Sequence, residues 1–228
     1  MPEIVAERVE LAFGEGAART SALRDVNAAI APEAFTIIMG PSGSGKTSLL
    51  SVLGALMTPD KGRVLVDGAD LTTMSAEQLA AFRRKYIGFV FQSFRLMAGL
   101  TAEENVRMSL TMRGMRDSRN HALRALAEVG LERKGHLKPD AMSGGEKQRV
   151  AVARALAHDP MIVLADEPTA SLDRASGLQV GDLLKAAVQR PGRALIVVTH
   201  DERLRPLADR VIFMEDGTIV REARKQYA

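Results

Sequence analysis

Residues 34–47 read Ala34-Phe-Thr-Ile-Ile-Met-Gly40-Pro-Ser-Gly-Ser-Gly-Lys46-Thr47, an apolar run that leads into a glycine-rich turn. The run predicts a buried strand over residues 34–39, and the segment after the turn predicts a helix over residues 46–56. The turn fits the pattern G-x-x-x-x-G-K-[ST] and stands where a strand becomes a helix, which is the context that this phosphate-binding loop requires. These residues therefore predict a site for a nucleoside triphosphate.

The chemistry of such a loop comes from its backbone. Glycines let successive N–H groups converge on the phosphates, and the start of the helix adds a partial positive charge. Lys46 would reach the β- and γ-phosphate oxygens, and the Thr47 hydroxyl would coordinate Mg²⁺. The alternative is a flexible Gly/Ser turn that matches by chance. The predicted nucleotide-binding residues are Gly40, Pro41, Ser42, Gly43, Ser44, Gly45, Lys46, Thr47 and Ser48.

Two carboxylates end another apolar run, residues 161–167. Successive strand residues point to opposite sides, so Asp166 and Glu167 have different roles. In P-loop NTPases the acid at the strand end holds Mg²⁺, which assigns Asp166, and Glu167 is then free to polarise a water at the γ-phosphate. The alternative is that both acids only cap the next segment.

A histidine follows a further buried strand, predicted over residues 194–199. If this strand neighbours the strand of Asp166, the His200 imidazole lies at the same edge of the sheet and can contact the γ-phosphate. A cap or a packed side chain is the alternative for His200. Asp201 is expected to N-cap the helix that follows.

The remaining pattern predicts an α/β fold. Buried strands that alternate with helices favour a largely parallel sheet, whereas residues 8–13 and 26–30 alternate as half-buried antiparallel strands do. No strand is evident between Ser93 and Ala157, and the turn at residues 215–218 predicts a hairpin. Other predicted strands cover residues 63–68 and 87–91, and predicted helices cover residues 102–112, 117–129 and 144–157. We predict one domain over residues 1–228, with a core of residues 1–92 and 158–228 and a helical insertion at residues 93–157.

The composition excludes several classes of protein. The chain has 228 residues, of which 46% are hydrophobic, and this content argues against disorder. It has no cysteine, which excludes disulfides and thiolate sites. A net charge of +3 with interspersed charges and 4% aromatic residues does not favour nucleic-acid binding. The longest uncharged stretch, residues 47–59, has thirteen residues, fewer than the roughly 18 that span a bilayer. The start lacks the pattern of a secretory signal.

A second glycine-containing motif, Ser143-Gly144-Gly145, opens a predicted helix. Together with the phosphate loop, Gln92, residues 166–173 and His200, in this order, it resembles the ATP-binding subunit of an ABC transporter over essentially the whole chain. The resemblance implies a P-loop NTPase (RecA-like) core with an antiparallel β subdomain and an inserted helical subdomain. It also implies ATP and Mg²⁺ as cofactors, with Glu167 and His200 as catalytic residues.

The resemblance assigns two further residues to the nucleotide. Phe13 stands where the family has an aromatic ring that stacks on adenine, with core packing as the alternative. Gln92 matches the family glutamine that senses Mg²⁺ and joins the core to the helical insertion, with a solvated loop residue as the alternative. The implied metal site is therefore Thr47, Gln92 and Asp166.

The same resemblance assigns residues that contact ATP held by the opposite subunit, namely Ser143, Gly144, Gly145 and Asp173. It therefore implies a dimer with two sandwiched nucleotides, and a homodimer is possible because every motif is present. A capping box formed by Ser143 and Glu146 is a structural alternative that is compatible with this role. Asp173 can equally cap the helix over residues 174–189.

Residues 91–106 and 164–169 and His136 are similar to the lipoprotein-releasing and macrolide-exporter type ATPases. That branch implies Mg²⁺-dependent ATP hydrolysis that energises a membrane complex for lipoprotein release or efflux. A separate transmembrane subunit is expected to dock near Phe94–Val106, with the chain peripheral on the cytoplasmic face of the membrane. Apolar residues there can instead be core of the insertion. Other functions left open are a nucleotide-gated scaffold of a cell-division-type complex and a soluble, non-transport ABC ATPase.

Overall fold

A six-stranded sheet organises the fold in the computed structural model, which describes residues 3–16 and 19–225. The first two residues of the segment in which we predict no secretory signal, Met1 and Pro2, lie outside the described residues. The strand order is β10-β9-β3-β8-β7-β6, parallel from β9 to β6, with β10 antiparallel at the edge. The strands are β3 (Phe35–Met39), β6 (Ile87–Phe91), β7 (Ile162–Asp166), β8 (Ala194–Val198), β9 (Arg210–Glu215) and β10 (Thr218–Arg224). The predicted parallel sheet and the C-terminal hairpin are confirmed.

A second, antiparallel sheet has the order β2-β1-β4-β5. Its strands are β1 (Ile4–Phe13), β2 (Thr20–Ile30), β4 (Lys61–Val66) and β5 (Ala69–Asp70). Both β1 and β2 are longer than predicted, because the pairing of β1 shifts register between Ala6 and Val9 and the alternation of apolar residues is interrupted there.

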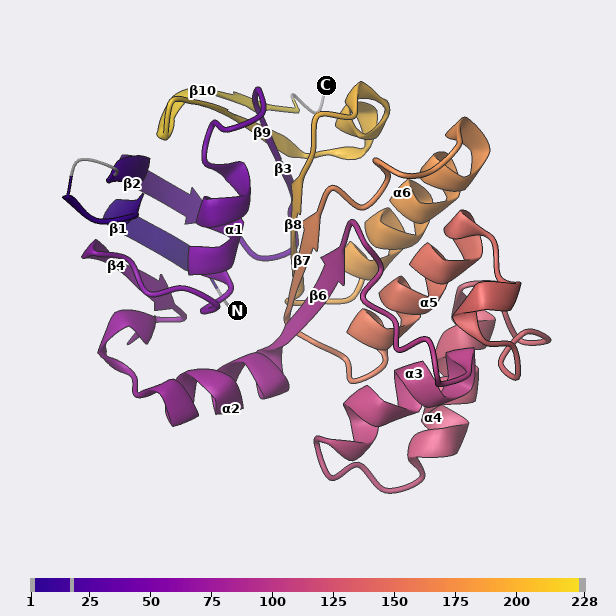
Figure 1. Ribbon diagram of the computed structural model, residues 1–228. Coiled ribbons are helices and arrows are strands. Elements are labelled where there is room, and N and C mark those ends of the chain that lie inside the picture. Colours follow the sequence, from indigo (N-terminus) through magenta and orange to yellow (C-terminus); the bar gives the residue numbers. More distant parts are fainter. Residues whose placement is uncertain (1–2, 17–18, 226–228) are drawn as a thin grey trace.

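Helix α1 (Lys46–Leu53) lies between the two sheets (Figure 1). Ile38 of β3 packs with Leu49 and Leu53 of α1 in one apolar cluster, whereas Ile37 belongs to a second cluster on the other face of the sheet. That face is covered by α5 (Gly144–Leu156) and α6 (Arg174–Val188). Because both faces of β3 are buried, the strand reads as a continuous apolar run.

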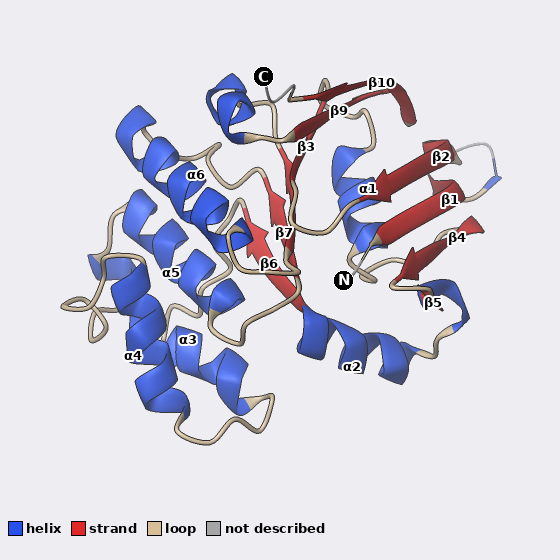
Figure 2. Ribbon diagram, turned by 180° about the vertical axis from the view of Figure 1, so that it is seen from behind, coloured by secondary structure: helices blue, strands red, loops and turns tan. Residues whose placement is uncertain are grey.

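The chain between β6 and β7 is helical, with α3 (Ala102–Thr111), α4 (Ser118–Glu128), a short 3-10 helix and α5. Figure 2 shows α3 and α4 at one end of the molecule, beyond α5. Helix α2 (Ala76–Tyr86) connects the antiparallel sheet to β6 and was not predicted, although its capping box at Ser75 and Gln78 is a recognisable start signal. In the part of the chain that the structure describes, no helix is both long and apolar enough to cross a bilayer.

Helix α1 is shorter than predicted. It ends at Leu53, and Gly54 takes the cap position. A Cβ at Gly54 would lie 2.6 Å from the Phe89 ring and 2.7 Å from Leu164. The close approach of β6 and β7 therefore requires a residue without a side chain at position 54.

His158 follows α5 and is packed against the end of α3. Its Nε2 lies 3.0 Å from Nη2 of Arg113, which donates to the neutral ring. Burial, and next the positive charge of Arg113, lower the pKa of His158 from 6.5 to about 4. Asp159 acts in the opposite direction and Arg193 in the same direction as Arg113. The folded protein therefore resists protonation of this ring.

This shift predicts a pH dependence of stability. The unfolded chain binds a proton at His158 near pH 6.5 and the folded chain only near pH 4, so the free energy of unfolding falls as the pH decreases between these values. The loss amounts to roughly 3 kcal/mol at most. We expect His158→Gln to remove this component in urea unfolding at pH 7.5, 6 and 5, whereas His136→Gln, at an exposed site, keeps it. Equal pH slopes for His158→Gln and wild type would contradict this account.

Candidate functional site

The phosphate loop occupies residues 40–45, between the end of β3 and the start of α1. Gly40 and Gly45 have φ of 155° and 93°, and a Cβ on either would lie within 2.3 Å of a backbone oxygen, of Met214 and Ala22 respectively. Glycine is therefore required at both positions. No side chain caps α1 at Gly45, so its first N–H groups remain available to an anion.

Lys46 folds back over the loop. Its Nζ donates to the carbonyl oxygens of Gly40 at 2.9 Å and Pro41 at 2.7 Å. Burial lowers the pKa of Lys46, while the carboxylates of Glu167 and Asp166 act to raise it. An arriving phosphate would give this ammonium group stronger acceptors than two neutral carbonyls.

Thr47 in the first turn of α1 contacts Asp166 at the end of β7. The Thr47 hydroxyl donates to Oδ1 of Asp166 at 3.0 Å. Burial raises the pKa of Asp166, the hydrogen bond from Thr47 lowers it, and the charge of Glu167 raises it further. A divalent cation bound here would stabilise the charged form of this carboxylate and so offset the cost of its burial.

The donor set at this point fits Mg²⁺ rather than a metal bound by protein ligands alone. Thr47 supplies a hydroxyl, Asp166 a carboxylate and Gln92 an amide, and hard oxygen donors of this kind suit Mg²⁺. Within residues 3–16 and 19–225, no group of three or more His, Cys, Asp or Glu side chains is placed to hold a metal. The arrangement matches a cation that keeps several waters and binds substrate phosphates.

Glu167 has an unusual backbone and three contacts with the end of β8. Its φ is 46°, a region that costs a non-glycine residue energy, and its N–H donates to the carbonyl of Val198 at 2.8 Å. Oε2 accepts from the Thr199 hydroxyl at 3.0 Å, and Oε1 lies 2.8 Å from Nδ1 of His200. The Glu167 side chain is 15% exposed and that of His200 70%, so the imidazole covers the carboxylate from the solvent side.

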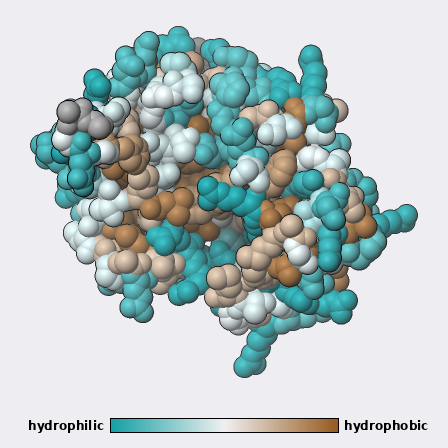
Figure 3. All heavy atoms as spheres, in the orientation of Figure 1, coloured by the Kyte–Doolittle hydropathy of each residue, from teal (hydrophilic) through white to brown (hydrophobic). Residues whose placement is uncertain are grey.

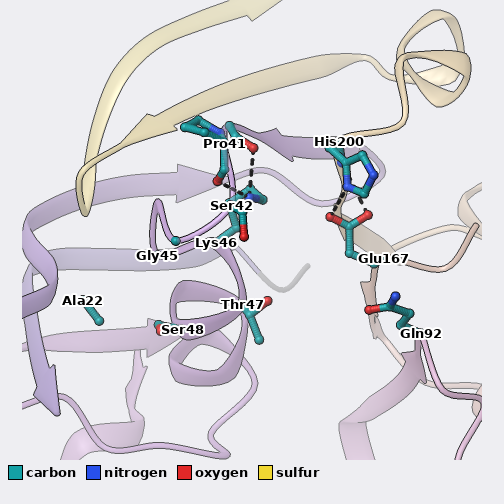
Figure 4. Close-up of a pocket in the computed structure, with 12 residues that line it drawn as sticks. Ala22, Pro41, Ser42, Gly45, Lys46, Thr47, Ser48, Gln92, Glu167 and His200 are labelled. Atoms are coloured by element: carbon teal, nitrogen blue, oxygen red, sulfur yellow. Dashed lines mark hydrogen bonds and ion pairs between the residues drawn. The ribbon is translucent and has the colours of Figure 1, made fainter. Parts of the chain in front are cut away.

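The phosphate loop, Lys46, Thr47, Glu167 and His200 surround one cavity of about 660 Å³. Figure 4 shows Lys46 and Thr47 on one side of it and Gln92, Glu167 and His200 on the other. The cavity is lined by Ala22, Gly40, Pro41, Ser42, Gly43, Gly45, Lys46, Thr47, Ser48, Gln92, Glu167 and His200. The structure thus brings together residues from β2, the phosphate loop, β6, β7 and β8.

Ser44, Phe13 and Asp166 belong to the predicted set but do not line the cavity, and Asp166 is connected to it through its hydrogen bond with Thr47. The Ser44 side chain is buried beneath the loop, so only its backbone can serve a ligand. Phe13, at the end of β1, does not line the cavity and is 44% exposed, which makes the core-packing alternative wrong. Ala22 lines the cavity and was not predicted, since no sequence signal marks an alanine on a neighbouring strand.

The Ser143–Gly145 motif and Asp173 do not line the cavity. Ser143 caps α5 in a capping box with Glu146, and Asp173 caps α6 through the N–H of Ser176. Both structural alternatives are therefore present. Ser143 and Gly144 are nevertheless exposed, while a Cβ on Gly145 would lie 2.6 Å from Oγ of Ser176. Within one chain these residues lie outside the nucleotide cavity.

The segment at residues 94–106 is partly core. Ala102 and Val106 are fully buried, and Asn105 donates to the carbonyls of Met97, Leu100 and Thr101. For Ala102 and Val106 the core alternative holds.

Known proteins of one family resemble the chain. It matches the ABC transporter family over residues 23–170. An uncharacterized ABC transporter ATP-binding protein of Methanocaldococcus jannaschii is 44% identical over 219 residues, which cover 95% of this chain and 97% of that protein. The lipoprotein-releasing system ATP-binding protein LolD of Bacteroides fragilis is 42% identical over 200 residues, 87% of this chain and 93% of LolD.

The macrolide export ATP-binding/permease protein MacB of Chlorobaculum tepidum is 41% identical over 229 residues, which cover all of this chain but 35% of MacB. The chain thus spans about a third of that exporter. A dimeric structure of a post-hydrolysis state of the ATP-binding cassette MJ0796, bound to ADP and Pi, superposes with a TM-score of 0.91. The two chains are 39% identical, and the match covers 98% of this chain and 100% of the other. Sequence, fold and cavity agree, and the chain belongs to the ABC transporter family as an ATP-binding cassette.

Proposed function

We propose that this ABC ATPase hydrolyses ATP with Mg²⁺ in a nucleotide-sandwich homodimer and so energises a membrane complex of the lipoprotein-release or efflux type. The observation that carries the proposal is the convergence of Lys46, Thr47, Glu167 and His200 around one cavity, while Ser143 is exposed elsewhere on the chain. A complete site then needs a second copy.

The cavity has the groups for attack of water on a terminal phosphate. The loop N–H groups and Lys46 hold the phosphates, and Glu167 takes the role of general base for the attacking water. His200 and Thr199 fix the orientation of the Glu167 carboxylate. Bound Mg²⁺, held by Thr47, Asp166 and Gln92, would neutralise charge on the phosphates.

The dimer follows from the exposed start of α5. Ser143 and the N–H groups of Gly144 and Gly145 form a helix N-terminus whose N–H groups can donate hydrogen bonds to the γ-phosphate of ATP bound by the partner. The dimeric MJ0796 structure is consistent with this arrangement. Loss of the γ-phosphate would remove the bridge between subunits and open the dimer.

The proposed role at a membrane is supported by the names of two relatives. LolD is named for a lipoprotein-releasing system and MacB for macrolide export with a permease part in the same chain. We propose that this chain acts at the cytoplasmic face of a membrane, where a membrane subunit receives the work of dimer closure and opening.

The first test removes the proposed base. We expect Glu167→Gln to bind ATP, to form an ATP-dependent dimer on a sizing column and to lose hydrolysis by about 100-fold or more, because the attacking water is no longer activated. Glu202→Gln is the matched control at an exposed position. Turnover at the wild-type rate in Glu167→Gln would exclude Glu167 as the base.

The second test addresses the phosphate loop. Lys46→Ala should weaken ATP binding by about tenfold or more, since a charged hydrogen bond to phosphate is lost. Equilibrium binding of a fluorescent ATP analogue measures the change, with Lys138→Ala, at an exposed site, as control. Unchanged affinity in a folded Lys46→Ala protein would contradict the assignment.

The third test separates the two roles of Ser143. Ser143 and Ser75 form equivalent capping boxes, at α5 and α2, so alanine at either should cost about 1 kcal/mol of stability. In the Glu167→Gln background, only Ser143→Ala should also weaken the ATP-dependent dimer, by about tenfold, through the lost contact with the partner's nucleotide. Equal dimerisation of the Ser143→Ala and Ser75→Ala proteins would leave Ser143 with the capping role alone.

A further inference from the structure

Two chain segments leave the six-stranded sheet side by side, one after β7 and the other after β8. Glu167 and Thr199 join them at one point, where the hydroxyl donates to the carboxylate. Two residues further along each segment, the Thr169 hydroxyl donates to Oδ2 of Asp201 at 2.6 Å. Neither Thr169 nor Asp201 lines the nucleotide cavity. The two segments are therefore linked twice, and the second link lies behind the site.

Both links are made by threonine hydroxyls in the interior. Figure 3 shows hydrophilic residues over much of the outer surface of the molecule, whereas Thr169 and Thr199 have no exposed surface. A buried hydroxyl costs free energy unless it is hydrogen-bonded. Each of these hydroxyls donates to a carboxylate of the opposite segment. Separation of the segments would leave both hydroxyls without an acceptor.

Asp201 also acts on Glu167 through its own backbone. The N–H of Asp201 donates to the Thr199 hydroxyl oxygen at 3.0 Å. The same hydroxyl donates to Oε2 of Glu167 at 3.0 Å. Because the N–H occupies one acceptor position of the hydroxyl oxygen, the hydroxyl hydrogen points toward the carboxylate. The position of Asp201 thus determines the position of a hydrogen-bond donor to the proposed base.

Arg203 holds the Asp201 carboxylate in place. Its Nε donates to Oδ1 and its Nη2 to Oδ2, both at 2.8 Å, and its backbone N–H donates to Oδ1 at 3.0 Å. Burial acts to raise the pKa of Asp201, but the hydrogen bonds from Arg203 and Thr169 lower it from 3.8 to about 2. The carboxylate is therefore charged at physiological pH, and its bond to the Thr169 hydroxyl is charge-assisted.

Glu167 requires support on both sides because its backbone is strained, with φ of 46°. On one side, its N–H donates to the carbonyl of Val198 at 2.8 Å. On the other side, only Pro168 separates it from Thr169, which Asp201 holds. Without the second link, the turn after β7 is free to relax, and the Glu167 carboxylate moves with it.

We propose that Thr169 and Asp201 are positioning residues for ATP hydrolysis, which hold Glu167 where it takes the proton of the attacking water. The proposal rests on the proposed function, in which Glu167 is the general base. Thr169 and Asp201 act through Glu167 rather than on the nucleotide. General-base catalysis depends on hydrogen-bond reach of the water, so a small displacement of this carboxylate is enough to slow the reaction.

The first experiment removes the second link alone. Thr169→Val deletes the hydroxyl and keeps a side chain of similar shape, and we expect kcat to fall about tenfold. Binding of a fluorescent ATP analogue should change less than twofold, because the phosphate loop is untouched. Thr169→Ser, which keeps the hydroxyl, should have a kcat within about twofold of wild type.

Thr36→Val is the matched control for this experiment. Thr36 is a fully buried threonine of β3 whose hydroxyl has no hydrogen-bond partner among the described residues. The same change of side chain therefore breaks no link there, and kcat should remain at the wild-type value. Asp201→Asn tests the link from the other side, because asparagine also caps a helix but lacks the charge that Arg203 and Thr169 bind. We expect its kcat to fall about tenfold as well.

A double-substitution cycle with Glu167→Gln distinguishes positioning of the base from a general structural role. Residual hydrolysis in Glu167→Gln, measured as a single turnover, no longer depends on the carboxylate, so Thr169→Val should change it less than twofold. A tenfold fall in that background would overturn the proposal, as would wild-type kcat in both Thr169→Val and Asp201→Asn. An equal loss in Thr169→Ser would also overturn it. Loss of hydrolysis in Glu167→Gln with normal turnover in Thr169→Val and Asp201→Asn would leave the proposed function intact, whereas wild-type turnover in Glu167→Gln would remove the base itself.

Discussion

The parallel pairing of β3, β8 and β7 is the constraint on which the site depends. Residues 35–38 pair with residues 195–198, and these pair with residues 163–166, so the three strands end at one edge of the sheet. The chain then leaves β3 into the phosphate loop, β7 into Asp166 and Glu167, and β8 into Thr199 and His200. Side chains more than a hundred residues apart in sequence meet there, as in other open α/β sheets in which ligands bind outside the carboxyl ends of the strands.

Close backbone approach is the second requirement of the site. Gly40 lies against the carbonyl of Met214 in β9, and Gly45 lies against the carbonyl of Ala22 in β2. The loop is therefore packed between a strand of each sheet. On the other side, Glu167 keeps its positive φ because its N–H and carboxylate are both bonded to the end of β8. Of these three positions only Glu167 is a non-glycine residue at positive φ, so only its backbone is strained, and these hydrogen bonds hold it in place.

Strand β6 lies between the nucleotide cavity and a second groove of about 530 Å³. Gly88, Phe89 and Phe91 line this groove, and Gln92, directly after the strand, lines the nucleotide cavity. Arg95, three residues further on, stacks on Phe91 and also acts electrostatically on Asp166. A segment of eight residues therefore borders both the groove and the proposed metal site.

The chain by itself determined the phosphate loop, the buried strands and the acidic pair, because each is a local pattern with its own physical cause: glycines where φ is positive, continuous apolar runs where both sheet faces are covered, and carboxylates at a strand end. Local signals also marked the caps at Ser143 and Asp173. Helix α2 and the beginnings of β1 and β2 were missed, since α2 buries none of its residues and β-bulges interrupt the alternation in β1. Only the tertiary structure decided that Glu167 is held by His200 and Thr199, that Phe13 is exposed, and that Ala22 borders the cavity. Strand order and helix packing bring these residues together, and no sequence pattern connects them.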